Sequence, residues 1–324
     1  MGSPILAVDL GGTKTVAALV RLGDGSPVVE HELTVPTPAS SGGRAVLSAA
    51  LSLANAVVAR ARAEGAAVGP CCVGISSAGT VSPRDGVVTH ATDVLPGWAG
   101  TRLAEAFRRS LALPAYALND VHAHGLGEAV HGAATGHRSV LAVAVGTGVG
   151  GAVVVDGQVW VGERGVAGHV GHVPVPEASG MPCTCGRTGH LEGLASGSGI
   201  RAAFRARTGL DVPATQVSCL ASGAGQVGDD ARTLLADAGR ATGRVIGGLL
   251  NVLDPDVAVV GGGMTAAAAP WRQSLHEGVA QEAMDVVAAT PVIISDAGAH
   301  AALWGAAHWA SARHTTGHHR TPTP

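Results

Sequence analysis

Short apolar runs alternate along the chain with glycine-rich turns and with longer Ala-rich segments. The short runs have the length and the flanking turn residues of buried strands, and the longer segments show the helical spacing of apolar positions. We expect strands at residues 4–10, 14–20, 28–35, 71–79, 115–118, 139–145, 152–155, 257–260 and 291–294. We expect helices at residues 43–64, 101–111, 121–131, 226–252, 268–284 and 299–312. This alternation predicts an α/β fold.

One arrangement, a strand followed by a glycine turn and a returning strand, occurs twice. It surrounds DLGGTK near the N-terminus and GTGVGG near the middle of the chain. The repetition predicts two related halves, each with a sheet flanked by helices. We place an N-terminal α/β domain at residues 1–118, onto which the helix at 299–312 packs, and a C-terminal α/β domain at residues 119–298. The last residues, 313–324, have the composition of a disordered tail.

Composition narrows the class of protein. The 324 residues are 46% hydrophobic and 14% charged, which is typical of a globular chain of about two domains. The net charge of −3 and the absence of a basic stripe predict that nucleic acid is not a partner. No apolar run reaches the ~18 residues of a membrane span, so we expect no membrane association. The N-terminus has neither a basic region nor a cleavage site, which predicts a cytoplasmic protein.

The first glycine turn, DLGGTK, has the residues of a phosphate site. Gly11 and Gly12 lack Cβ atoms, so backbone N–H groups there can approach an anion closely. Asp9 supplies a carboxylate for a metal ion or its water, and Thr13 and Lys14 supply side-chain donors. A plain hairpin turn has the same pattern, so both interpretations remain open for this motif by itself.

The second glycine turn, GTGVGG, has the G-x-G-x-x-G spacing of a dinucleotide-binding turn. Such a turn needs a helix directly after the glycines and an acidic residue ~20 positions further on. The residues that follow are AVVVDGQVWV, which is a strand pattern. We therefore expect Gly146, Thr147 and Gly148 to hold a phosphate in a β-turn, and we do not expect a nicotinamide cofactor.

A third glycine turn lies between a predicted strand and a predicted helix. It consists of Gly261, Gly262 and Gly263, and it suits adenosine or its α-phosphate. Each turn taken singly is a weak signal. Three such turns, each after a strand, fit a nucleotide that lies in a cleft between two domains, as in the actin-like ATPase (ribonuclease H-like) fold.

These motifs resemble those of the ROK family of sugar kinases. DLGGTK is similar to the family's first phosphate motif and GTGVGG to its second, and AGHVGHVPV followed by CTCGRTGHLEGLASG resembles its long signature. The resemblance implies an actin-like fold of two α/β domains with an interdomain cleft. It also implies transfer of the γ-phosphoryl group of ATP, with Mg²⁺, to a hexose hydroxyl, usually the 6-OH. A homodimer or homotetramer is expected from the same resemblance.

The resemblance also assigns roles in the sugar site. Asp120 matches the general base, and Asn119 matches a sugar-binding residue; an N-cap and a turn residue are the structural alternatives. Ser77 and Gly79 border the sugar in this interpretation. Glu192 matches a sugar contact, although a carboxylate at a helix start is favoured by the helix dipole in any case.

The Cys-rich loop, residues 169–192, is similar to the family's structural zinc site. His172, Cys183 and Cys185 match three of its four ligands. His190 stands where the family has a third cysteine, and histidine is also a zinc ligand, so the four residues still make a closed site. His172 can in addition orient the sugar.

The identity of the sugar depends on position 169. His169 replaces the family's usual Glu, as in some bacterial N-acetylmannosamine kinases, whereas PGW at 96–98 is more similar to the glucokinases. A neutral imidazole has one donor and one acceptor and can donate to the carbonyl of an N-acetyl group. We expect N-acetylmannosamine, with glucose as the alternative; packing of His169 beside the zinc loop remains open.

Two classes without catalysis compete with the kinase. ROK repressors share the fold but carry an N-terminal helix-turn-helix domain, for which the position of Asp9 leaves no room. A catalytically silent sugar sensor is disfavoured because Asp120 and all three glycine turns are present.

Overall fold

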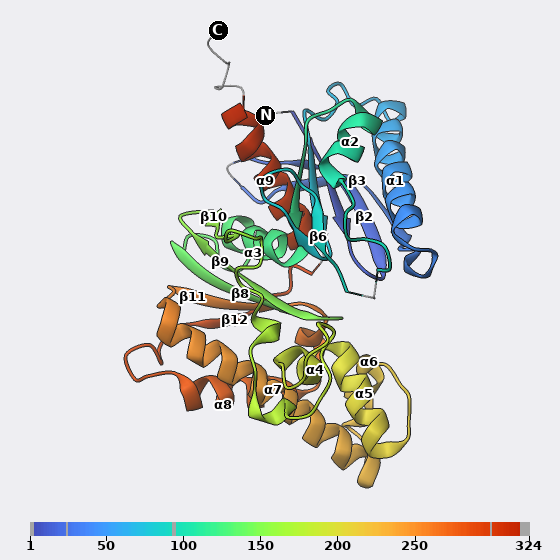
Figure 1. The fold of residues 1–324 in the computed structure, drawn as a ribbon. Helices are drawn as coiled ribbons and strands as arrows, with labels where there is room; N and C mark the ends of the chain where they lie inside the picture. The colour runs from blue at the N-terminus through green and yellow to red at the C-terminus, as the bar shows by residue number, and fades with distance from the viewer. Residues whose placement is uncertain (1–2, 24, 93–94, 299, 318–324) are drawn as a thin grey trace. The chain divides into compact units, whose positions relative to one another are not determined.

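The computed structural model describes residues 3–23, 25–92, 95–298 and 300–317, and it divides into two compact units (Figure 1). The ranges of the first unit are Met1–Gly136, Gly157–Ala167 and Ala299–Pro324. The ranges of the second unit are His137–Asp156 and Gly168–Gly298.

The first unit is built on a five-stranded sheet with the order β3-β2-β1-β4-β7. Its strands are β1 (Ile5–Leu10), β2 (Lys14–Arg21), β3 (Val28–Pro36), β4 (Val73–Ser77) and β7 (Ala115–Asn119). The other elements are η1 (Ala39–Ser41), α1 (Gly43–Ala63), β5 (Thr80–Val81), β6 (Val88–His90), α2 (Leu103–Leu111), α3 (Asp120–His131), β10 (Gln158–Val159) and α9 (His300–Gly317). Because β1, β4 and β7 are parallel to one another, their carboxyl ends lie at one edge of the sheet.

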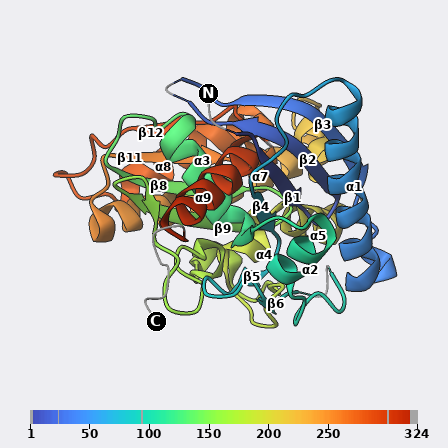
Figure 2. The ribbon, with the colours of Figure 1, turned by 90° about the horizontal axis from the view of Figure 1, so that it is seen from above.

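Alternate residues of β1 belong to opposite layers of the first unit. Leu6 and Val8 are buried in the core that α1 closes, whereas Ile5 and Ala7 are buried in the core that α9 closes. Figure 2 shows α1 and α9 on opposite sides of these strands. Because both faces are covered, the strand is a continuous apolar run rather than an alternation of apolar and polar residues.

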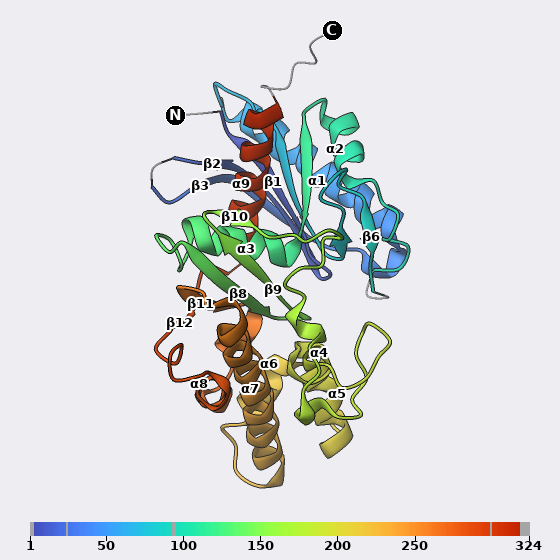
Figure 3. The ribbon, with the colours of Figure 1, turned by 60° about the vertical axis from the view of Figure 1, so that its left-hand side comes forward.

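The second unit repeats this plan. Its strands β8 (Ser139–Val145), β9 (Val149–Val155), β11 (Val257–Gly261) and β12 (Val292–Ile294) are neighbours in the order β9-β8-β11-β12. The remaining elements are η2 (Val170–His172), η3 (Pro176–Ala178), α4 (Leu191–Ala195), α5 (Gly197–Thr208), α6 (Ala214–Leu220), α7 (Gln226–Leu253), η4 (Gly263–Ala266) and α8 (Ala269–Glu282). Figure 3 shows α7 and α8 side by side, below the strands of this unit. The strand, glycine turn and antiparallel return of β1-β2 recur in β8-β9, as predicted.

Two predicted boundaries are wrong. The first unit continues past residue 118 to Gly136, because α3 packs against α9 and β7, and it also takes the segment Gly157–Ala167. Residues 313–317 of the predicted disordered tail continue α9, where the Arg313 guanidinium stacks on the Trp309 ring. The rest of that tail, 318–324, lies outside the described residues.

The helix α1 also departs from expectation. By its composition and its length of 21 residues, it is apolar enough to cross a membrane, and the sequence had predicted no such segment. A core helix passes the same test, and α1 buries Ala50, Leu53 and Val57 in the core of the first unit.

Candidate active site

A set of polar side chains gathers at the carboxyl ends of the parallel strands of the first unit. Asp9 near the end of β1 is in register with Ser76 of β4, and Ser77 is in register with Asn119, the last residue of β7. Asp120 follows as the first residue of α3. The strand ladder therefore brings together residues that the sequence separates, at the edge where α/β sheets bind ligands.

Asn119 uses both atoms of its amide. Its Oδ1 accepts hydrogen bonds from the backbone N–H groups of Val121 (3.1 Å) and His122 (3.2 Å), so Asn119 is the N-cap of α3. Its Nδ2 donates to Gly79 O (2.8 Å) and to Asp120 Oδ1 (2.9 Å). The alternative in which Asp120 caps the helix is therefore wrong, because Asn119 takes that position and orients the Asp120 carboxyl.

The Asp120 carboxyl has the electrostatics of a base that works near neutral pH. Burial, and then the nearby charge of Asp9, raise the pKa of Asp120 to about 7, against the opposing hydrogen bonds from Val121 N and Asn119. Burial also raises the pKa of Asp9, although a hydrogen bond from Ser76 Oγ (2.6 Å) and the charge of Lys14 lower it. Sequence reasoning missed Ser76, whose only signal is its place beside Ser77 at the end of a buried strand.

The loop after β4 is held in place by Trp98. This ring is fully buried, and its Nε1 donates to Ser77 Oγ (3.2 Å) and Ala78 O (3.1 Å). The PGW motif thus supports the loop that contains Ser77 and Gly79. The sequence alone does not connect Trp98 with this loop, because the tryptophan lies 19 positions after Gly79 in the chain.

The first glycine turn is a tight connection between β1 and β2. Gly11 N donates to Lys14 O (3.1 Å), and Thr37 Oγ1 donates to Gly11 O (2.8 Å). Thr13 and Lys14 are exposed and Gly12 is partly exposed. The turn is therefore a hairpin whose side-chain donors remain accessible to an anion.

The second and third glycine turns are neighbours within the second unit. β8 and β11 are parallel and adjacent, and the 146–148 and 261–263 turns follow their carboxyl ends. A Cβ atom added to Gly146 would lie 3.8 Å from Gly263 N. The strand β9 starts at Val149, directly after the second turn, so the prediction that no dinucleotide-binding helix follows is confirmed.

Four potential metal ligands converge in the Cys-rich loop. The donor atoms of His172, Cys183, Cys185 and His190 all lie within 4.8 Å of one another. His172 Nδ1 is 3.5 Å from Cys183 Sγ, and His190 Nδ1 is 3.3 Å from Cys185 Sγ. A tetrahedral zinc ion with bonds of 2.0–2.3 Å separates its ligand atoms by about 3.3–3.8 Å, so the donor set fits zinc.

The segment that carries His169 and His172 lies directly against β9. A Cβ atom at Gly171 would be 2.1 Å from Val149 O, so this position requires glycine. The rings of His169 and His172 are 6.2 Å apart between centroids. His169 thus lies beside His172, one of the four potential metal ligands.

Glu192 lies within the protein rather than at an open surface. It is 8% exposed, its Oε2 accepts from Val149 N (2.9 Å), and its Oε1 accepts from Thr184 Oγ1. Sequence reasoning missed Thr184 and Val149, because neither is a conventional site residue.

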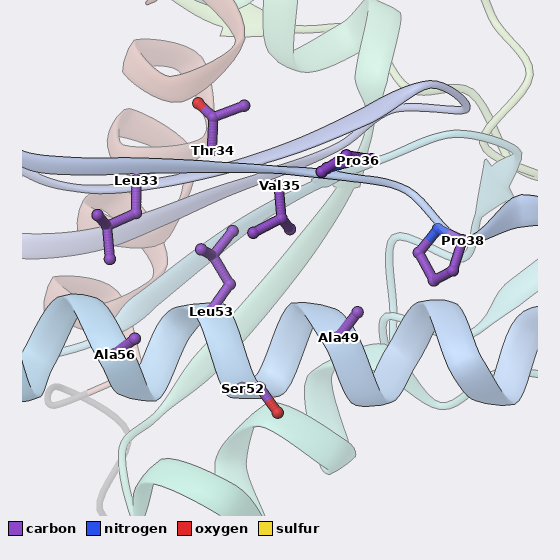
Figure 4. A pocket seen from close by; sticks show the side chains of 9 residues that line it. All are labelled: Leu33, Thr34, Val35, Pro36, Pro38, Ala49, Ser52, Leu53 and Ala56. Atoms are coloured by element: carbon purple, nitrogen blue, oxygen red, sulfur yellow. The ribbon is translucent and has the colours of Figure 1, made fainter.

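A pocket outside these clusters is apolar. It has a volume of about 480 Å³ and lies between β3 and α1 (Figure 4). Its lining residues are Leu33, Thr34, Val35, Pro36, Pro38, Ala49, Ser52, Leu53 and Ala56. The hydroxyls of Thr34 and Ser52 point away from the gap between strand and helix, so the pocket offers no catalytic group.

The chain is similar to known proteins over most of its length. A model of the ROK family matches residues 5–313. An N-acetylmannosamine kinase of Shigella flexneri is 34% identical over 266 residues, which are 81% of this chain and 84% of that protein. An N-acetylmannosamine kinase of Salmonella typhi is 32% identical over 263 residues with the same coverage.

Solved structures give the same result. The ROK hexokinase of Thermus thermophilus has a TM-score of 0.81 and 30% identity, over 97% of this chain and 99% of that one. A ROK glucokinase of Streptomyces griseus, in complex with glucose and AMPPNP, has a TM-score of 0.76 and 27% identity, over 95% and 99% of the two chains. The predicted actin-like α/β fold is confirmed.

Proposed function

The chain belongs to the ROK family, and we propose that it is an ATP-dependent sugar kinase that phosphorylates the 6-hydroxyl of an N-acylhexosamine. The observation that carries the proposal is the carboxyl of Asp120 at the carboxyl ends of three parallel strands, beside Asn119 and with its pKa raised to about 7. A base of this kind is matched to proton transfer near neutral pH.

The reaction needs positioning and charge neutralisation more than covalent chemistry. The sugar oxygen attacks the γ-phosphorus, the bond to the β-phosphate oxygen breaks, and the hydroxyl proton passes to Asp120. We assign nucleotide phosphates to the glycine turns at 11–12 and 146–148, and adenosine or its α-phosphate to the turn at 261–263. Asp9 would hold Mg²⁺ or its water, and the ion would neutralise the charge of the phosphates.

We assign a structural zinc ion to the four-ligand cluster of the Cys-rich loop, which the donor geometry supports. The ion would fix His172 and, three residues before it, His169. Asn119, His169, His172 and Glu192 are the proposed sugar contacts, with Ser77 and Gly79 at the border.

N-acetylmannosamine is the proposed substrate. The relatives named above carry that activity in their names, and an imidazole at position 169 can donate to an amide carbonyl. A carboxylate at position 169, the family's usual Glu, accepts hydrogen bonds from two sugar hydroxyls. A neutral imidazole has one acceptor and cannot make both bonds, so His169 disfavours glucose as the substrate.

The test is a coupled assay over a sugar panel. N-acetylmannosamine, glucose, N-acetylglucosamine, mannose and fructose are compared with a control that measures ATP hydrolysis without sugar. The proposal expects the highest kcat/KM with N-acetylmannosamine. A tenfold preference for glucose would replace the substrate, and absence of turnover with every sugar would favour a sugar sensor over a kinase.

A further inference from the structure

The carboxylate of Glu192 joins two segments of the second unit that are far apart in the sequence. Oε1 accepts from Thr184 Oγ1 in the metal loop, and Oε2 accepts from Val149 N (2.9 Å), directly after the second glycine turn. A Cβ atom at Gly148 would lie 2.8 Å from Oε2, so the turn is closely packed against the carboxylate. A displacement of Glu192 would therefore displace the turn as well.

Two residues that follow Glu192 in the chain donate hydrogen bonds to backbone carbonyl groups of the same turn. Gly197 N donates to Gly146 O (2.7 Å), and Ser198 Oγ donates to Thr147 O (3.0 Å). The residues Gly146, Thr147 and Val149 are thus fixed by groups from one short stretch of chain. The position of that stretch decides the shape of the turn.

Thr184 connects this arrangement with the metal site because it lies between two of its ligands, Cys183 and Cys185. A metal ion held by both cysteines fixes the backbone on either side of Thr184. Cys183 Sγ is also 3.9 Å from Glu192 Oε1, but a metal-bound thiolate has no proton to donate. In the metal-bound protein, Thr184 is the donor that remains for Oε1 among the contacts described.

We propose that Thr184 is a positioning residue through which metal binding sets the geometry of the second glycine turn. Its hydroxyl holds the Glu192 carboxylate so that Oε2 faces Val149 N. The inference rests on the proposed function in one respect, the assignment of nucleotide phosphate to residues 146–148. Metal occupancy then changes affinity for the nucleotide without any contact between the metal and the nucleotide.

The experiment compares the zinc-loaded wild type with Thr184→Val, which loses the hydroxyl, and with Thr184→Ser, which keeps it. AMPPNP affinity is measured by calorimetry, zinc content by elemental analysis, and backbone exchange by hydrogen–deuterium exchange of a peptide that contains Val149. We expect Thr184→Val to keep its zinc, to bind AMPPNP roughly three- to tenfold more weakly and to exchange at Val149 faster by a similar factor. Thr184→Ser should stay within about twofold of the wild type.

Two outcomes would overturn the link between Thr184 and the turn, and a third would bear on the proposed function. Equal AMPPNP affinity and equal exchange at Val149 in all three proteins would overturn it. Loss of zinc in Thr184→Val, with retention in Thr184→Ser, would mean that the hydroxyl acts on the metal site itself, and would overturn it as well. Failure of the wild type to bind AMPPNP would instead refute the proposed function, while the exchange at Val149 would still test the link.

A second measurement separates positioning from a general structural role. Partial chelation of zinc should weaken AMPPNP binding in the wild type and change it much less in Thr184→Val, whose link is already broken. The exchange of amides further along β9, at 152–155, should be the same in all variants. An equal loss on chelation in the wild type and in Thr184→Val would contradict the proposal.

Discussion

The candidate residues of the first unit (here the strand-held half of the set) and those of the second unit (the loop-held half) are held in place by different means. Around Asp120, the backbone hydrogen bonds between the strands β1, β4 and β7 set the positions of the side chains. Around His172, by contrast, the chain is irregular, and glycine contacts, side-chain hydrogen bonds and a set of metal donors set the positions.

This difference predicts that substitutions in the two halves have different effects on activity and on structure. Substitution of Asp120 in the strand-held half should remove chemistry and leave the fold, because the β-ladder does not depend on this side chain. A substitution in the loop-held half should remove local structure first and activity as a consequence. The four experiments below test this contrast.

The largest effect is expected for Asp120→Asn, which removes the base and preserves the shape of the side chain. We expect kcat to fall by ~10²–10⁴-fold, with sugar and nucleotide binding largely intact. The Tm at pH 8 should be at least that of the wild type, because a raised pKa means that the ionised form of Asp120 is disfavoured in the folded state. A kcat near that of the wild type would remove Asp120 from its role.

Loss of a metal ligand in the loop-held half should first destabilise the structure and only then lower the activity. We expect about one zinc per chain in the wild type, and zinc loss with a Tm lower by roughly 5 °C in Cys183→Ala. His190→Cys is the matched control, since zinc accepts either nitrogen or sulfur, and it should keep the metal and the Tm. A metal-free wild type with full activity would contradict this view of the loop.

The pH dependence tests the electrostatics of the strand-held half. Asp120 must be ionised to accept a proton, so kcat/KM should fall about tenfold per pH unit below the pKa of about 7 and level off above it. In Asp9→Asn, removal of the neighbouring negative charge should move this limb to lower pH, whatever happens to the plateau. A limb that stays in place would show that Asp9 does not influence the base.

The smallest effect is expected for His169→Glu, which tests the loop-held half without touching a metal ligand. The preference for N-acetylmannosamine over glucose, measured as the ratio of the two kcat/KM values, should fall by about tenfold. Zinc content provides the control. An unchanged ratio would mean that His169 packs beside the metal loop without contacting the sugar.

The strands that position Asp120 could be predicted from the sequence, because hydrophobic runs locate strands. Asn119 ends such a run, Asp120 follows it, and Asp9 lies one residue before the end of β1. Ser76 was missed, and the PGW motif gave no sign that Trp98 holds the 77–79 loop, because both hydrogen bonds depend on how distant segments pack.

In the loop-held half the ligand types and their spacing were visible, and the four metal donors do converge. The link through Thr184 was not, because threonine between two cysteines carries no pattern of its own. The boundary at residue 118 was misplaced for a related reason. Helical periodicity located α3, but it does not say that α9, from the other end of the chain, packs against α3.

The double use of Asn119 restricts where the substrate range of such a protein can change. Asn119 is the last residue of β7 and the N-cap of α3. Its Nδ2 also donates to Gly79 O in the 77–79 loop and to Asp120 Oδ1. A replacement of Asn119 would therefore uncap α3 and remove the hydrogen bond that orients Asp120, the proposed base. For the proposed kinase, a change of substrate is therefore expected to start at side chains with fewer hydrogen bonds to the fold, such as His169, rather than at Asn119.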